Sequence, residues 1–149
     1  MQNPLARLLL LEVSKPSLPN PIIITKIRMT SLQINNQTHP LRSPLQVDYC
    51  TSFLCQLRGL TFRRSLPPNW GLLLVQQKES RLDAAIHMFM MWMDLAVVWI
   101  NSAHQVVDVR KAFRWKSVII PKAPAKYVLE LPIDRLNDFQ IGDQIEMVP

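Results

Sequence analysis

His87 is the residue whose type and neighbours most directly suggest chemistry. Asp83 precedes it by four residues and Asp94 follows it by seven. If this segment is a regular strand, Asp83 and His87 share a face, and a carboxylate beside an imidazole can orient it as a general base. The serines of the chain lack the glycine context of a nucleophile elbow. A hydrogen-bonded and catalytically silent histidine is therefore the simpler interpretation.

Four methionines close to His87 raise a second possibility, a soft-metal site. Thioether and imidazole groups together suit Cu(I). On a strand, however, successive side chains alternate between faces, so Met88 and Met90 point away from His87, Met91 and Met93. Each face then keeps at most three candidate ligands, and methionine commonly fills irregular cores. The sequence predicts core packing here, with no metal and no cofactor.

A run of basic residues is the third candidate. Residues 110–126 carry six positive charges and no acid, with aromatic residues between them. Cations neutralise phosphates and aromatic rings stack on bases, so such a run could bind an anionic ligand or single-stranded nucleic acid. A solvated loop and strand face explains the run equally simply and is favoured. The residues are Arg110, Lys111, Phe113, Arg114, Trp115, Lys116, Lys122, Lys126 and Tyr127.

The two cysteines, Cys50 and Cys55, predict neither a disulfide nor a zinc site. Five residues apart on a helix they would point to different faces, and no second pair completes a zinc knuckle. We expect buried free thiols, which suits a reducing compartment. Gly-rich phosphate loops, H-E-x-x-H motifs and EF-hand loops are also absent from the sequence.

The length of 149 residues and an apolar share of 48% predict a single packed domain. Residues 1–28 carry four basic residues and one acidic residue, which is half of the net charge of +6. Prolines interrupt this leader and its apolar run is too short for a signal peptide. We expect a disordered extension or a misassigned start at 1–28, one β domain at 29–149, no membrane span and a cytoplasmic location.

Short apolar stretches separated by Pro, Asn and Gly predict a mainly β protein. The Asn35-Asn36 pair and the polar segment 76–80 are expected as turn and loop. A short helix should follow Thr51 or Ser52 and end at Gly59, and Asp134 should cap a helical turn. About nine short strands with one or two short helices favour a compact β-sandwich or jelly-roll-like barrel. The expected strands are 32–34, 45–49, 72–75, 84–91, 95–100, 105–109, 117–120, 126–131 and 144–148.

Several of these segments, in this order and spacing, resemble the domain of unknown function 192, a family of bacteria and archaea. They are Arg58-Gly59-Leu60-Thr61-Phe62-Arg63 followed by Leu66, Gly71 to Val75, His87 to Ile100, Val106-Val107, Pro124 to Leu131, and Ile141-Gly142-Asp143. The resemblance covers residues 31–148. It implies a compact β domain and no particular activity. We interpret its motif residues as structural: Arg58, Gly59, Arg63, Gly71, Pro124, Glu130, Gly142 and Asp143.

One departure from the family pattern concerns the central strands. Many members carry Phe-Trp-Met-Lys-Asn-Thr followed by Pro-Leu-Asp. Here the first stretch is Met88 to Met93, and the Pro and Asp positions hold Asp94 and Ala96. If the Lys-Asn pair and the Asp form a site in other members, this chain lacks it.

These observations favour a binding or accessory domain over an enzyme. The polar and aromatic residues that core packing leaves unexplained are expected on one concave face, where they would bind a small molecule or a protein. A small hydrolase or metal-dependent enzyme is the first alternative, and it needs His87 to meet Asp94, Asp108 or Glu130 in one cleft. Binding of an anion or nucleic acid through residues 110–126 is the second, less expected alternative. The candidate ligand-binding residues are His87, Asp94, Arg114, Trp115 and Tyr127.

Overall fold

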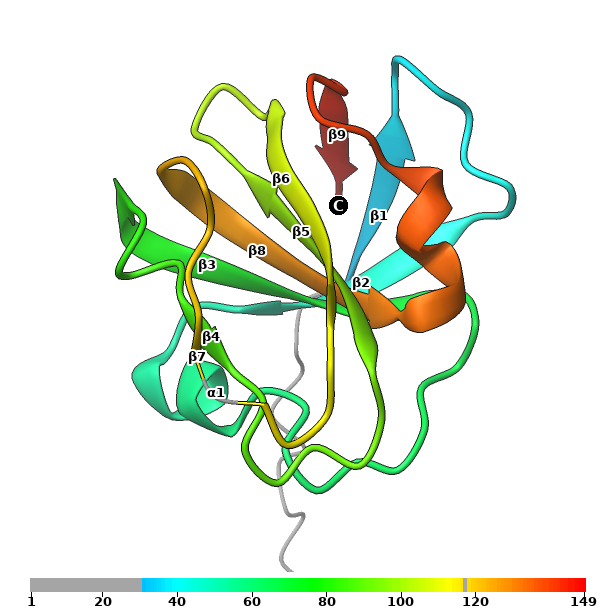
Figure 1. The fold of residues 1–149 in the computed structure, drawn as a ribbon. Helices are drawn as coiled ribbons and strands as arrows, with labels where there is room; N and C mark the ends of the chain where they lie inside the picture. Colours follow the sequence, from blue (N-terminus) through cyan, green and yellow to red (C-terminus); the bar gives the residue numbers. More distant parts are fainter. Residues whose placement is uncertain (1–30, 117) are drawn as a thin grey trace, which may run out of the picture.

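Nine strands and two short helices make up the part of the chain that the structure describes (Figure 1). The structure is a computed structural model, and it describes residues 31–116 and 118–149, so the expected leader at 1–28 lies outside it. The helices are α1 (Phe53–Arg58) and the 3-10 helix η1 (Ile133–Asp138). The strands are β1 (Ser31–Asn36), β2 (Leu45–Cys50), β3 (Trp70–Ser80), β4 (Ile86–His87), β5 (Leu95–Ile100), β6 (Val106–Ala112), β7 (Val118–Ile119), β8 (Ala125–Pro132) and β9 (Ile145–Val148).

Seven strands form one curled half-barrel sheet in the order β6-β5-β8-β3-β2-β1-β9. Neighbours are antiparallel except β2 and β3, which run parallel. A parallel pair needs a crossover, and α1 lies within this one. β4 and β7 pair separately as a two-stranded sheet. Within the described ranges, no helix is long and apolar enough to cross a membrane.

The large sheet is covered on both faces, and β5 shows this most clearly. All six of its residues are fully buried, and alternate residues belong to two different core clusters. One cluster lies on the side of α1 and the small sheet, and we call this side the α1 face. The other lies on the side of η1, which packs against β5, β6 and β8, and we call it the η1 face.

The structure confirms the mainly β fold and the number of strands expected from the sequence. The hairpin of β5 and β6 and the short helix capped by Ser52 and ended by Gly59 are also as expected. The Ser52 hydroxyl accepts a hydrogen bond from the Cys55 backbone N–H at 3.3 Å, which is the standard role of an N-cap.

Four local expectations were wrong. Residues 76–80 extend β3 instead of forming a loop, since Gln77, Lys78 and Glu79 face solvent and Gln76 is buried while the strand continues. Only Ile86 and His87 of the expected strand 84–91 are extended, because turns precede and follow them. Asn35 and Asn36 belong to β1, and Asp134 does not cap η1 but forms an ion pair with Arg42 at 2.6 Å.

The expectation of free thiols was also wrong, because Cys50 and Cys55 form a disulfide. Cys50 is the last residue of β2, not a helical residue, and the chain bends at Ser52 before α1 begins. The two Cα atoms therefore lie 5.8 Å apart, within the normal range for a disulfide. The bond fastens α1 to the end of β2, and the argument for a reducing compartment loses its basis.

Candidate functional site

Glu130 lies in β8 and points to the α1 face. Its register partners Leu72 and Val97 are core residues of that face. The side chain is buried, and its Oε2 has no hydrogen-bond partner among the described residues. Burial raises the pKa of Glu130 from 4.5 to about 7. A carboxyl group that titrates near neutral pH without a fixed partner is more typical of a functional site than of a structural one.

The end of α1 brings two motif residues beside this carboxylate. Gly59 ends the helix with a φ of 43°, a backbone conformation that residues other than glycine rarely adopt. A Cβ at this position would lie 3.7 Å from Glu130 Oε2. Arg58, the last residue of α1, is exposed and lines the mouth of the same cavity. The Arg-Gly motif and the glutamate motif, far apart in sequence, therefore meet at one place.

His87 reaches the same cavity from the small sheet. It is the second residue of β4 and pairs with Val118 of β7. Its Nδ1 is buried and has no hydrogen-bond partner within the described ranges. The structure thus holds two buried polar atoms without partners, one on His87 and one on Glu130, that belong to residues lining one cavity. Buried polar groups are normally hydrogen-bonded, so such exceptions point to a missing ligand or water.

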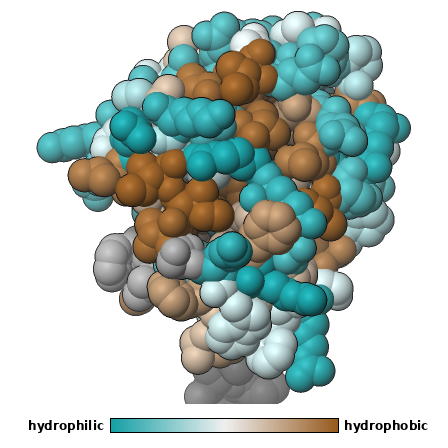
Figure 2. Space-filling view, viewed as in Figure 1, coloured by the Kyte–Doolittle hydropathy of each residue, from teal (hydrophilic) through white to brown (hydrophobic). Residues whose placement is uncertain are grey.

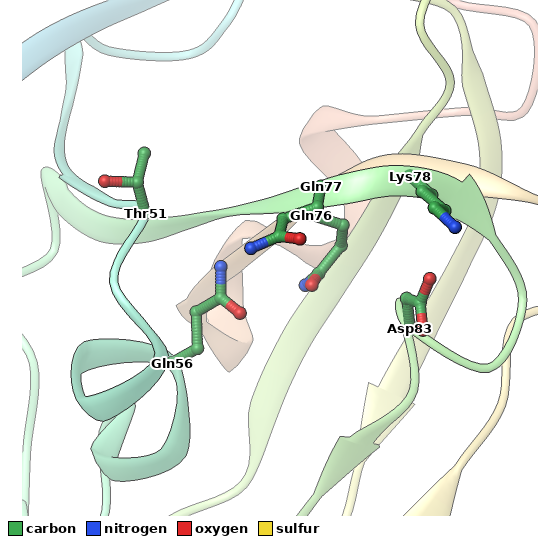
Figure 3. A pocket seen from close by; sticks show the side chains of 6 residues that line it. All are labelled: Thr51, Gln56, Gln76, Gln77, Lys78 and Asp83. Carbon is green, nitrogen blue, oxygen red and sulfur yellow. The ribbon is translucent and has the colours of Figure 1, made fainter.

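The cavity has a volume of about 140 Å³ and combines an apolar wall with several polar groups. Beside it lies an open groove between α1 and the loop after β3. The cavity and the groove share Gln56, Gln76 and Asp83, so they are continuous. Figure 3 shows Gln56 of α1 and Asp83 flanking the glutamines of β3. The residues that line the cavity are Gln56, Arg58, Leu60, Thr61, Leu74, Gln76, Asp83, Ala85, Ile86, His87, Met91 and Glu130.

Three other candidates from the sequence lie together, but outside this cavity. Asp94 accepts a hydrogen bond from the backbone N–H of Arg114 at 3.0 Å and pairs with Lys111 at 3.2 Å. The bond from Arg114 is the main reason that the pKa of Asp94 is lowered. Trp115 follows Arg114 and donates its backbone N–H to Met88 at 3.0 Å. This group is adjacent to the segment that carries His87.

Tyr127 lies apart from all of them. Its register partners are Val75 and Ile100, which both belong to the η1 face. Its ring packs edge-on against His104 with ring centroids 5.3 Å apart. The basic run is divided as well, because Arg110 pairs with Asp108 at 2.8 Å and Lys126 donates to the Gln77 carbonyl.

The remaining motif residues have structural surroundings. The guanidinium of Arg63 lies over the Trp70 ring at 4.7 Å. Gly71 allows β3 to approach β8, and Pro124 is exposed directly before β8. Gly142, with a φ of 97°, makes the turn that presents Asp143.

Asp143 holds the loop that follows β1. It is buried and accepts hydrogen bonds from Asn36 at 2.7 Å and from the Gln140 backbone at 2.8 Å, with His39 Nδ1 at 2.6 Å. Although burial opposes it, these bonds lower the pKa of Asp143.

The methionines near His87 occupy different environments. Met88 and Met91 are buried in the core of the α1 face, whereas Met90 is about half exposed. They therefore do not form one donor set. Across 31–116 and 118–149, no group of three His, Cys, Asp or Glu residues could hold a metal ion.

Sequence reasoning considered His87 with Asp83, and named Glu130 as a partner of His87 only in the enzyme alternative. It otherwise assigned Glu130 and Arg58 to structure, and it overlooked the glutamines. One signal was present. Glu130 is a lone acid between Leu129 and Leu131 in a strand whose other residues are mostly apolar. Acidic side chains are rarely buried, so a glutamate on a strand that is buried on both faces indicates a polar cavity beside it. The cavity on the α1 face is the one that Glu130 lines.

Comparison with known proteins places the chain in a family. The family model for DUF192, described as "Uncharacterized ACR", matches residues 33–147. The chain belongs to the DUF192 family. A UPF0127 protein of Thermococcus gammatolerans is 39% identical over 101 residues, covering 66% of this chain and 64% of that protein. A UPF0127 protein of Pyrococcus horikoshii is 33% identical over 115 residues, covering 76% of this chain and 96% of that protein.

The match spans slightly less than two thirds of the length of the Thermococcus relatives. Two solved structures share the DUF192 fold seen here. A protein from Sinorhizobium meliloti 1021 superposes with a TM-score of 0.69 at 20% identity, covering 78% of this chain and 92% of that one. A protein of unknown function from Novosphingobium aromaticivorans gives 0.67 at 16% identity, covering 88% and 94%.

Proposed function

We propose that this DUF192 domain is a non-catalytic binding domain that takes a small polar molecule into the cavity between His87 and Glu130. The observation that carries the proposal is the pair of buried, unpartnered atoms, His87 Nδ1 and Glu130 Oε2, on residues lining one cavity. A ligand that bonds to both would remove the cost of leaving them unsatisfied. Its polar groups would supply the hydrogen-bond partners that the two atoms lack within the described residues.

The lining suggests which ligands fit. Arg58 and Asp83 carry opposite formal charges, and the pKa of Glu130 lies near neutrality, so the cavity has no strong net charge to select an ion. The side chain of Gln76 adds an amide donor and acceptor, and Gln56, whose Nε2 donates to the Val75 carbonyl at 2.5 Å, adds its amide oxygen. The volume of about 140 Å³ suits a small molecule. We therefore favour an uncharged ligand with several hydroxyl or amide groups, such as a polyol, a small sugar or an amide.

Thermal denaturation of the full chain against a panel of polyols, sugars and amides tests this proposal. A ligand at one hundred times its dissociation constant stabilises the fold by about 2.7 kcal/mol. We expect His87→Ala and Glu130→Gln to abolish the ligand-induced shift. Tyr127→Phe, on the η1 face, is the matched control and should keep it. A panel without any stabilising compound, or a shift that both cavity variants retain, would contradict the proposal.

One observation favours a second candidate, general acid–base catalysis in the same cavity. A pKa of about 7 for Glu130 is well suited to a group that takes up and releases protons near neutral pH. Of the acids considered for the enzyme alternative, only Glu130 lines a cavity with His87, whereas Asp94 and Asp108 pair with basic side chains elsewhere. Hydrolysis of p-nitrophenyl acetate that rises as pH passes through neutrality, and that Glu130→Gln removes, would favour this candidate over simple binding.

A further inference from the structure

Three loops at one end of the molecule expose large apolar side chains. They are residues 61–64 after α1, residues 88–93 before β5, and residues 113–116 after β6, and Figure 1 shows them at the lower end of the fold. Figure 2 shows apolar side chains reaching the surface on this side of the molecule among hydrophilic ones. We call the exposed side chains of these loops the loop-tip patch. Its apolar members, each 47–63% exposed, are Phe62, Phe89, Met90, Trp92, Phe113 and Trp115.

Direct contacts hold the three loops together. The Phe62 backbone N–H donates to the carbonyl of Met90 at 3.3 Å, and the Trp115 N–H donates to the carbonyl of Met88 at 3.0 Å. The rings of Trp92 and Trp115 pack edge to face with centroids 5.4 Å apart. The patch is therefore one continuous surface.

The backbone at the tips is strained. Phe62, Met90 and Trp115 have φ values of 68°, 57° and 61°, a region that bulky residues rarely occupy. Across the described residues, only His104 shares this conformation among non-glycine residues. Three of these four residues are thus large apolar side chains at the tips of one patch. Strain of this kind persists where the surroundings impose it, and it clusters at functional sites.

Basic side chains accompany the apolar ones. Arg64 lies over the Trp92 ring at 5.8 Å, and Lys111 and Lys116 lie over the Phe113 ring at 4.7 and 5.9 Å. Arg114 is exposed beside them. Asp94 is the acid that contacts this group, and it already pairs with Lys111. The patch is therefore apolar at its tips and positively charged around them.

We propose that the loop-tip patch docks this domain onto the surface of an anionic phospholipid membrane. Tryptophan and phenylalanine side chains favour the interface between headgroups and acyl chains. Lysine and arginine beside them are attracted to acidic headgroups. The patch combines these two features on one surface, and its charge complements that of the proposed occupant.

The geometry favours a membrane over single-stranded nucleic acid. Base stacking needs open aromatic faces, but lysines lie over Phe113 and an arginine lies over Trp92. Trp92 and Trp115 meet edge to face, not in parallel. Met90 offers no ring at all, yet its side chain is held outward at a strained position. Insertion of tips into an apolar layer uses all of these side chains.

The membrane proposal stands independently of the ligand cavity, because none of the six apolar tips lines that cavity. Co-sedimentation of the full chain with vesicles tests it. We expect binding to vesicles of equal parts phosphatidylcholine and phosphatidylserine, weaker binding to pure phosphatidylcholine, and progressive loss of binding as salt is added.

Variants locate the contact. We expect Trp92→Ser and Trp115→Ser each to weaken partitioning about tenfold, because each removes a large apolar side chain from the interface. Lys116→Glu should weaken the preference for phosphatidylserine, because it reverses one of the four charges of the patch. Ile141→Ser is the matched control, since Ile141 is 63% exposed on another loop, and it should bind as the wild type does. Circular dichroism checks that each variant is folded.

Two results would overturn the proposal. One is vesicle binding that the double variant Trp92→Ser/Trp115→Ser retains in full, which would place the contact elsewhere in the chain. The other is absence of binding to both vesicle types, and retention on an oligo-dT column in that case would identify nucleic acid as the ligand of the patch.

Discussion

Replacing Glu130 with glutamine should change how the stability of the domain depends on pH. Burial raises the pKa of Glu130 from 4.5 to about 7 in the folded state. Between these two values the folded chain binds a proton that the unfolded chain has released. The free energy of unfolding therefore falls as pH rises from about 4.5 to about 7, and this contribution stays lost at higher pH. Glutamine has nearly the same shape and does not titrate.

The magnitude follows from the two pKa values. A tenfold change in proton affinity corresponds to about 1.4 kcal/mol, so the rise from 4.5 to about 7 corresponds to about 3 kcal/mol. Glu130→Gln should thus match the wild type near pH 4.5 and exceed its stability by up to about 3 kcal/mol near pH 8. For a domain of this size, that difference raises the melting temperature by roughly 10 °C.

Urea denaturation of both proteins at a series of pH values measures the effect. The difference between the two curves isolates the contribution of Glu130 to the free energy of unfolding. Glu79, Asp94 and Asp143 also have shifted pKa values, all of them lowered, but they are common to both proteins and their contributions cancel. Glu146→Gln removes a carboxylate from an exposed position of β9 and controls for the change in charge. Parallel stability curves for the wild type and Glu130→Gln, or a variant that is less stable at high pH, would refute the reasoning.

Three further predictions concern stability, each measured by denaturation of the full chain. Replacing Cys50 and Cys55 by serine should cost about 2 kcal/mol, because the disulfide closes a short loop, and a reducing agent should have the same effect on the wild type alone. Gly71→Ala should cost about 2 kcal/mol, because its Cβ would lie 2.5 Å from Leu131 Cδ2 and 2.9 Å from a backbone oxygen; a variant as stable as the wild type would contradict the close approach of β3 and β8. Asp143→Asn should cost about 2 kcal/mol at neutral pH, and its deficit should shrink as acid protonates the wild-type carboxylate, whose pKa is lowered; a deficit independent of pH would rule out this explanation.

The parts of the fold that the sequence predicted are those decided by local chemistry. A continuous apolar run identifies β5 because both of its faces are buried. Ser52 and Gly59 predict the two ends of α1 because a cap and a left-handed residue act within a few positions. In both cases the information lies inside the segment itself.

The parts that were missed depend on distant contacts. The polar residues 76–80 look like a loop until the pairing of β3 with β8 is known. The disulfide was rejected by treating Cys50 and Cys55 as residues of one helix, although the predicted cap at Thr51 or Ser52 places Cys50 before the helix, and the path of the chain between β2 and α1 is what brings the two cysteines together. The sequence could not select Glu130 from the three acids considered as partners of His87, because β4 and β8 belong to different sheets and the cavity is lined by residues of both.

The pairing of the first strand with the last has a consequence for engineering. β1 and β9 lie side by side at the edge of the large sheet, with Gln33 opposite Val148. The two ends of the described chain therefore lie close together, and a short linker could join them. The turn at 101–104 joins two strands of the opposite edge, so the chain could be reopened there. Such a circular permutant would leave the His87–Glu130 cavity intact and would move the chain ends to the turn at 101–104, beside the start of β9, where the His104 carbonyl accepts a hydrogen bond from the Ile145 N–H at 2.9 Å.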